Sequence, residues 1–160
     1  MERVLFLLVG VLIGFLLSSF LVNPYFLPEE SKEVLDFINS SSQSLDIVIY
    51  SLYESTLTDL IIAKADEGVK VRIIVNEKRF EPYTVHKLNS HPNIEVRIAR
   101  TTTHAKFYIV DGLKVMVGSN NISKSALKRN VEAGVFILFL NVDEFKHKFN
   151  TLWNNAIPLQ

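Results

Sequence analysis

Residues 104–121 have the sequence HAKFYIVDGLKVMVGSNN, which contains the clearest structural signal in the chain. Two runs rich in β-branched and aromatic residues, Lys106–Val110 and Lys114–Val117, are separated by Asp111-Gly112-Leu113. An Asp-Gly pair between two such runs is typical of a tight β-hairpin. We therefore predict two antiparallel strands joined at Asp111.

The polar residues of this stretch are expected to converge. Side chains two residues apart on a strand point to the same face, so His104 and Lys106 should project together. The hairpin then returns the chain and brings Ser119 and Asn121 beside His104. This set suits a phosphodiester substrate, because a cation and neutral donors can hold the non-bridging oxygens while histidine attacks phosphorus.

The flanking sequence predicts alternating helices and strands. The strand–helix–strand pattern of residues 45–75 implies a parallel pair with a right-handed crossover. The fold class is therefore α/β, with a mixed β-sheet flanked by helices on both faces. Helices are expected at residues 29–40, 56–67, 83–88 and 142–153, and the other strands at 45–50, 69–75, 94–99 and 131–140.

Residues 4–22 contain only apolar residues, glycine and serine. About 20 such residues in a helix span a bilayer, so we predict a single-pass N-terminal transmembrane anchor. The alternatives are a signal peptide, which lacks a small-x-small cleavage site here, and a buried core helix, which would show a polar face. The predicted organisation is an anchor or uncleaved signal at 1–22, a proline-bracketed linker at 23–31 and a domain at 32–160.

The orientation of this anchor depends on few charges. Arg3 and the amino terminus precede the apolar run, and the positive-inside rule counts basic residues. The prediction is a cytoplasmic N-terminus and an extracytoplasmic domain at the membrane.

Composition limits the possible chemistry. The 160 residues include no cysteine, which excludes disulfides, thiolate catalysis and cysteine-ligated metals. The formal net charge is zero, yet residues 86–130 contain eight basic and only two acidic residues. This basic third of the chain is either a solvated face or an anion-binding cleft.

The spacing of these residues resembles the HKD motif of the phospholipase D superfamily, His-x-Lys-x-x-x-x-Asp followed by six residues and Gly-Ser-x-Asn. Residues 45–52 and 68–72 are similar to the first two strands of that family, so the resemblance covers residues 32–153. Glu132 stands where the family often has a carboxylate that orients the histidine. The positions that match the motif are His104, Lys106, Asp111, Gly118, Ser119 and Asn121.

The resemblance implies a phospholipase D/nuclease-like fold and a phosphodiesterase that forms a phosphohistidine and uses no metal or other cofactor. Family members build one site from two motifs, whereas this chain has one. It is therefore similar to the short, single-motif branch, which includes bacterial nonspecific endonucleases and mitochondrial-type cardiolipin hydrolases. That branch implies a homodimer in which each chain contributes His104. The expected site residues are His104, Lys106, Asp111, Ser119, Asn121 and Glu132; Lys106, Ser119 and Asn121 would bind the substrate phosphate.

Three functions remain open from the sequence. The first is a membrane-anchored nonspecific endonuclease that acts on nucleic acid, and the alternative is a phospholipase D that hydrolyses cardiolipin or phosphatidylcholine. A non-enzymatic scaffold is the third, although the complete motif argues against it. A metal site of His104, Asp111 and Glu132 is disfavoured because the Lys106 ammonium would repel a divalent cation.

Overall fold

The computed structural model describes residues 6, 9, 10, 14 and 21–159. Within them the strands form an 8-stranded sheet in the order β1-β7-β6-β5-β2-β3-β4-β8. The strands are β1 (Val22–Leu27), β2 (Ser44–Ile49), β3 (Lys70–Asn76), β4 (Ile94–Ala99), β5 (Phe107–Val110), β6 (Lys114–Gly118), β7 (Glu132–Leu138) and β8 (Ile157–Pro158). The helices are α2 (Ser31–Asn39), α3 (Thr56–Asp66), α4 (Pro82–Asn89), α5 (Lys124–Lys128) and α6 (Val142–Asn155).

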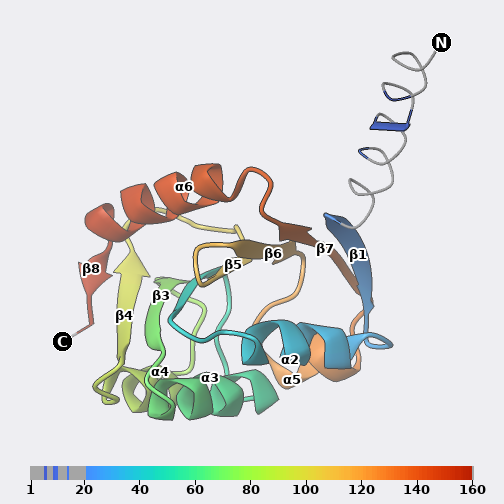
Figure 1. The fold of residues 1–160 in the computed structure, drawn as a ribbon. Helices are drawn as coiled ribbons and strands as arrows, with labels where there is room; N and C mark the ends of the chain where they lie inside the picture. The colour runs from blue at the N-terminus through green and yellow to red at the C-terminus, as the bar shows by residue number, and fades with distance from the viewer. Residues whose placement is uncertain (1–5, 7–8, 11–13, 15–20, 160) are drawn as a thin grey trace.

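The sheet is mixed, as the sequence predicts. β2, β3 and β4 pair in parallel, whereas β5 pairs antiparallel with both β2 and β6. Figure 1 shows α6 over one face and α2, α3, α4 and α5 over the other. The prediction of an α/β fold with helices on both faces is confirmed.

Two apolar clusters, one on each face, hold the layers together. Successive residues of β2 point to opposite faces and so belong to different clusters. Ile47 and Ile49 belong to the cluster on the side of α2–α4. Val48 belongs to the other cluster, with Phe149 and Trp153 of α6. The central strands are buried on both faces, which explains why their sequences are almost continuously apolar.

The prediction of a linker at residues 23–31 is wrong. Residues 22–27 form β1, which pairs antiparallel with β7 from Val22↔Ile137 to Leu27↔Glu132. Tyr25 and Leu27 are fully buried, and Phe26 between them is exposed. Pro24 is compatible with this strand because β1 lies at the edge of the sheet, where one row of backbone donors needs no partner.

Most of the predicted anchor at residues 4–22 lies outside the described residues, and its last residue, Val22, begins β1. Among the residues that are described, no helix has the length and apolar character needed to cross a membrane.

Candidate active site

The predicted histidine lies where the chain approaches the hairpin β5–β6. His104 is exposed, and it precedes β5 in a segment of residues 102–106 that has no regular secondary structure. The Thr103 N–H donates to Oδ1 of Asn76 (3.0 Å), and both residues are buried. Asn76 ends β3, so this hydrogen bond fixes the histidine segment at the carboxyl end of a parallel strand. Such strand ends are common positions for ligand sites in α/β folds.

His104 and Lys106 are in contact. Lys106 Nζ lies 3.3 Å from His104 Nδ1 and donates to the His104 carbonyl oxygen (2.9 Å). Both groups also contact the ring of Tyr50, whose centroid lies 4.4 Å from that of His104 and 5.2 Å from Lys106 Nζ. The predicted imidazole–ammonium pair therefore forms, and an aromatic ring supports it.

Lys106 is only 7% exposed, although its charge faces the site. Burial lowers the pKa of Lys106 below its ordinary value, because the charged form loses hydration. The Glu132 carboxylate opposes this effect and raises the pKa of Lys106. Glu132 is thus close enough to Lys106 for its charge to act on it.

Ser119 and Glu132 form a second hydrogen-bonded pair. Ser119 Oγ donates to Glu132 Oε2 (2.5 Å), and Asn130 Nδ2 donates to the other carboxylate oxygen (3.0 Å). The backbone of Ser119 is held by Ala133, whose carbonyl accepts from the Ser119 N–H (3.0 Å). Glu132 thus orients the serine hydroxyl, whereas the family resemblance predicted that it orients His104.

Asn121 connects the end of the hairpin to the end of β2. Its Oδ1 accepts a hydrogen bond from the Ser51 N–H (2.9 Å), next to Tyr50. Since Tyr50 contacts His104, this bond places Asn121 on the same side of the molecule as the histidine.

Two glycines give the site its support. An added Cβ at Gly118 would overlap Tyr25 Oη and lie 2.8 Å from the Ala133 carbonyl oxygen. One at Gly134 would lie 2.5 Å from Cζ of the same tyrosine. The Tyr25 hydroxyl donates to Oδ1 of Asn120, which is buried between Ser119 and Asn121. β1 therefore supports the loop that carries the predicted donors.

Asp111 does not join the other predicted site residues. It lies at the turn, at the opposite end of β5 from His104, in the left-handed conformation (φ 53°). Its carboxylate accepts from the backbone N–H groups of Ser42, Gln43 and Ser44 at 2.8–3.1 Å. Burial raises the pKa of Asp111, but these hydrogen bonds outweigh it and leave the pKa below its ordinary value. Asp111 is a structural clamp in this chain, and the metal site considered for His104, Asp111 and Glu132 does not assemble.

Tyr50 is a site residue that the sequence pattern did not identify. It ends the predicted strand at residues 45–50, and only the strand order shows that this end adjoins the histidine segment. Arg79 also extends over the Tyr50 ring, 5.6 Å from its centroid. A polar residue or a tyrosine at the carboxyl end of a buried strand is the signal that could have identified this position.

The exposed imidazole, the ammonium and the Ser119–Glu132 pair form one cluster of nucleophile, cation and hydrogen-bond donors. Arg79 lies over the Tyr50 ring of this cluster, and further exposed basic side chains occur in the residues that flank the motif in the sequence: Arg100, Lys124, Lys128 and Arg129. The cluster can hold an anion against the histidine.

Comparisons with known proteins agree with this geometry. Residues 34–153 match the family model described as "Cardiolipin synthase, PLD-like domain". The chain is 28% identical over 133 residues to a mitochondrial cardiolipin hydrolase from Chlamydomonas reinhardtii, covering 79% of this chain and 59% of that protein. It is 30% identical over 111 residues to a phospholipase D from Rickettsia bellii, covering 67% and 55%. The chain thus spans little more than half the length of these relatives.

A solved structure has the same architecture. The crystal structure of a phospholipase D family member, Nuc from Salmonella typhimurium, superposes with a TM-score of 0.76 at 26% identity. The superposition covers 87% of this chain and 97% of that one, so it includes nearly the whole described domain.

Proposed function

Because the chain belongs to the phospholipase D superfamily, we propose that it is a metal-independent phosphodiesterase, and specifically a membrane-anchored nonspecific endonuclease. The observation that carries the proposal is the contact between His104 and Lys106 beside the Ser119–Glu132 pair. The Lys106 ammonium in this cluster would repel a divalent cation, which supports a mechanism without a metal.

The reaction proceeds in two displacements. The imidazole of one His104 attacks phosphorus, a phosphorus–nitrogen bond forms, and the bond to the leaving oxygen breaks. A second His104 protonates that oxygen and then removes a proton from water, which attacks the phosphohistidine and releases the first imidazole.

Lys106 and the amide group of Asn121 donate to the phosphate, and Ser119 joins them when its hydroxyl proton turns from Glu132 to a phosphate oxygen. An oxygen of the substrate would draw the Lys106 ammonium away from His104 Nδ1, because charge-assisted hydrogen bonds to phosphate are stronger than those to a neutral nitrogen. Each well-placed donor contributes about 3 kcal/mol to stabilising the transition-state charge. Glu132 holds the hydroxyl of Ser119 in place, and its charge raises the pKa of Lys106 against the lowering that burial causes.

The second histidine comes from a second copy of the chain. The motif occurs once in the sequence, so a homodimer with a shared site supplies the general acid. Val131, next to Glu132, is 90% exposed, which supports a contact surface close to the site. Mixing wild-type chains with an excess of His104→Asn chains tests the sharing: independent sites would leave the activity per wild-type chain unchanged, whereas a shared site that needs both histidines would lose activity as mixed dimers form. Sedimentation of an active monomer would overturn the dimer.

Nucleic acid is the first proposed substrate class. The exposed bases near the cluster can follow a phosphate backbone. Tyr53, 41% exposed, donates its N–H to the Ile122 carbonyl next to Asn121, so it offers an aromatic face for a base near the site. The structure thus supplies an aromatic residue close to the motif from a distant part of the sequence.

Phospholipid is the second candidate, and the relative named mitochondrial cardiolipin hydrolase favours it. Cardiolipin and phosphatidylcholine contain the same phosphodiester group that the cluster can hold. The proposed anchor at residues 4–22 and an extracytoplasmic domain are compatible with either substrate.

A substrate panel distinguishes the two. The full chain in detergent is incubated with labelled single-stranded DNA, duplex DNA, RNA, and cardiolipin or phosphatidylcholine micelles, with a chelator present. Cleavage of nucleic acid alone supports the endonuclease, and release of a lipid headgroup or phosphatidic acid alone supports the phospholipase. Activity that the chelator abolishes would refute the metal-independent mechanism. His104→Asn serves as the matched inactive control.

A further inference from the structure

The end of β7 opposite the candidate active site carries exposed apolar side chains. Phe139 N–H donates to the Leu113 carbonyl (3.0 Å), which joins the β7–α6 connection to the hairpin turn. Leu138 N–H donates to the Leu21 carbonyl (2.8 Å), which joins it to the start of β1. Four side chains here, with 44, 52, 66 and 42% of their surface exposed, form what we call the apolar end: Val22, Leu113, Phe139 and Leu140.

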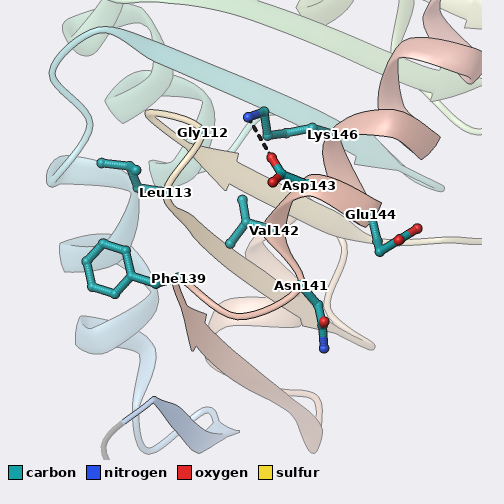
Figure 2. Close-up of a pocket in the computed structure, with 8 residues that line it drawn as sticks. All are labelled: Gly112, Leu113, Phe139, Asn141, Val142, Asp143, Glu144 and Lys146. Carbon is teal, nitrogen blue, oxygen red and sulfur yellow. Dashed lines mark hydrogen bonds and ion pairs between the residues drawn. The ribbon is translucent and has the colours of Figure 1, made fainter.

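The backbone holds Phe139 outward. Its φ is 63°, in the left-handed region that a bulky aromatic residue rarely adopts. Burial in the domain does not compensate for this conformation, because Phe139 is mostly exposed. Figure 2 shows Leu113 and Phe139 projecting to the same side of the loop, and Glu144 pointing to the other. The loop therefore presents two large apolar side chains together, with Glu144 turned away and Asp143 paired with Lys146.

The sequence before β1 indicates what covers the apolar end. Residues 4–20 are uncharged and almost entirely apolar, and Leu21 is already hydrogen-bonded to β7. If the anchor ends at this point, no flexible linker remains between the bilayer and the first strand of the sheet. The end of the domain that carries Val22 must then lie at the membrane surface, where exposed Phe and Leu are favourable.

We propose that the apolar end rests in the interfacial layer of the bilayer that holds residues 4–22, with the catalytic end facing the aqueous phase. This rests on the proposed anchor and deepens the proposed function. The register from Val22↔Ile137 to Leu27↔Glu132 spans five residues of β7, or about 17 Å. Glu132 and the Ser119 hydroxyl bonded to it therefore lie about that distance along the strands from the apolar end. A nucleic acid in solution reaches them, whereas a phosphodiester in the same leaflet does not.

Depth-dependent quenching tests the contact. The full chain carrying Phe139→Trp or Leu113→Trp is reconstituted in phosphatidylcholine vesicles with plain or dibrominated acyl chains. Tyr83→Trp is the matched control, since Tyr83 is 70% exposed but belongs to α4. Trp153 is buried and gives a constant background. Bromination should reduce the added emission of the two apolar-end variants at least twofold and leave that of Tyr83→Trp unchanged.

The outcomes separate the claims. Unquenched Phe139→Trp and Leu113→Trp in chains that float with the vesicles would overturn the contact while leaving the anchor intact. Chains that do not float would overturn both. Hydrolysis of host-bilayer lipid by vesicle-bound chains would refute the orientation. Quenching in chains that cleave neither nucleic acid nor lipid would support the contact and refute only the proposed function.

Discussion

Replacing Gly118 with alanine should disturb both the stability of the sheet and the candidate active site. The added methyl group would overlap Tyr25 Oη and lie 2.8 Å from the Ala133 carbonyl oxygen and 3.0 Å from Gly134 Cα. Two of these three neighbours are backbone atoms of β7, so the structure can relax mainly by moving Tyr25. The Tyr25 hydroxyl holds Asn120, and its movement would displace the adjacent Ser119 and Asn121.

The magnitude follows from these contacts. Overpacking of this kind costs about 2 kcal/mol of unfolding free energy. Tyr25→Phe alone removes a buried hydrogen bond to Asn120 and should cost about 1–2 kcal/mol. The double variant should be about 1 kcal/mol more stable than the sum predicts, because the phenylalanine lacks the oxygen that the new methyl group overlaps.

Urea unfolding of the full chain in detergent measures the coupling, and phosphodiesterase activity is measured in parallel. Gly134→Ala provides the matched contrast: its Cβ would also lie 2.5 Å from the ring carbon Cζ and from the Val117 carbonyl oxygen, which Tyr25→Phe does not remove. Rescue should therefore be smaller at Gly134. Strict additivity at Gly118, or equal rescue at both glycines, would refute the argument that the tyrosine oxygen is the limiting contact.

Three further outcomes are expected. His104→Asn should lower the rate of phosphodiester cleavage at least a thousandfold with an unchanged circular dichroism spectrum; near-normal turnover would disprove its role as the nucleophile. Asp111→Asn, which tolerates the left-handed backbone, should lose about 1–2 kcal/mol of unfolding free energy at neutral pH after allowing for partial exposure. The pKa of Asp111 is lowered in the folded state, so its carboxylate stabilises the fold above about pH 4 and loses this effect as the pH falls. The free energies of unfolding of wild type and variant should therefore converge in acid. A difference that stays constant with pH would contradict this. The cleavage rate should fall as the pH rises through the pKa of Lys106, which is lowered below about 10.5. Lys106→Arg should remove this alkaline decrease from the activity that remains. The same alkaline decrease in wild type and variant would exclude Lys106 as its source.

The chemistry of the site could be predicted in part from local sequence. The positions of His104, Lys106 and Ser119 follow from one hairpin, whose turn and strands are encoded by adjacent residues. Asp111 belongs to the same motif, but spacing alone does not distinguish a residue at the turn from one at the open end. The partner of Glu132 also depends on side-chain direction, and in this chain it is Ser119.

The role of Tyr50 depends on strand order. β2 lies next to β5 although more than fifty residues separate them in the sequence, and this adjacency places the Tyr50 ring against His104. Periodicity predicts that a strand exists but not which strand lies beside it, because pairing depends on long-range packing.

The sequence by itself determined the alternation of helices and strands, the β5–β6 hairpin and the histidine–lysine pair, because these depend on turn residues and on side-chain periodicity over a few positions. Only the tertiary structure decided that residues 22–27 form β1. Two prolines and a short apolar run are compatible with a linker, and pairing with β7 is what buries Tyr25 and Leu27. That pairing also places the apolar end and the catalytic end at opposite ends of the same strands, since each antiparallel register fixes which residues share an edge of the sheet.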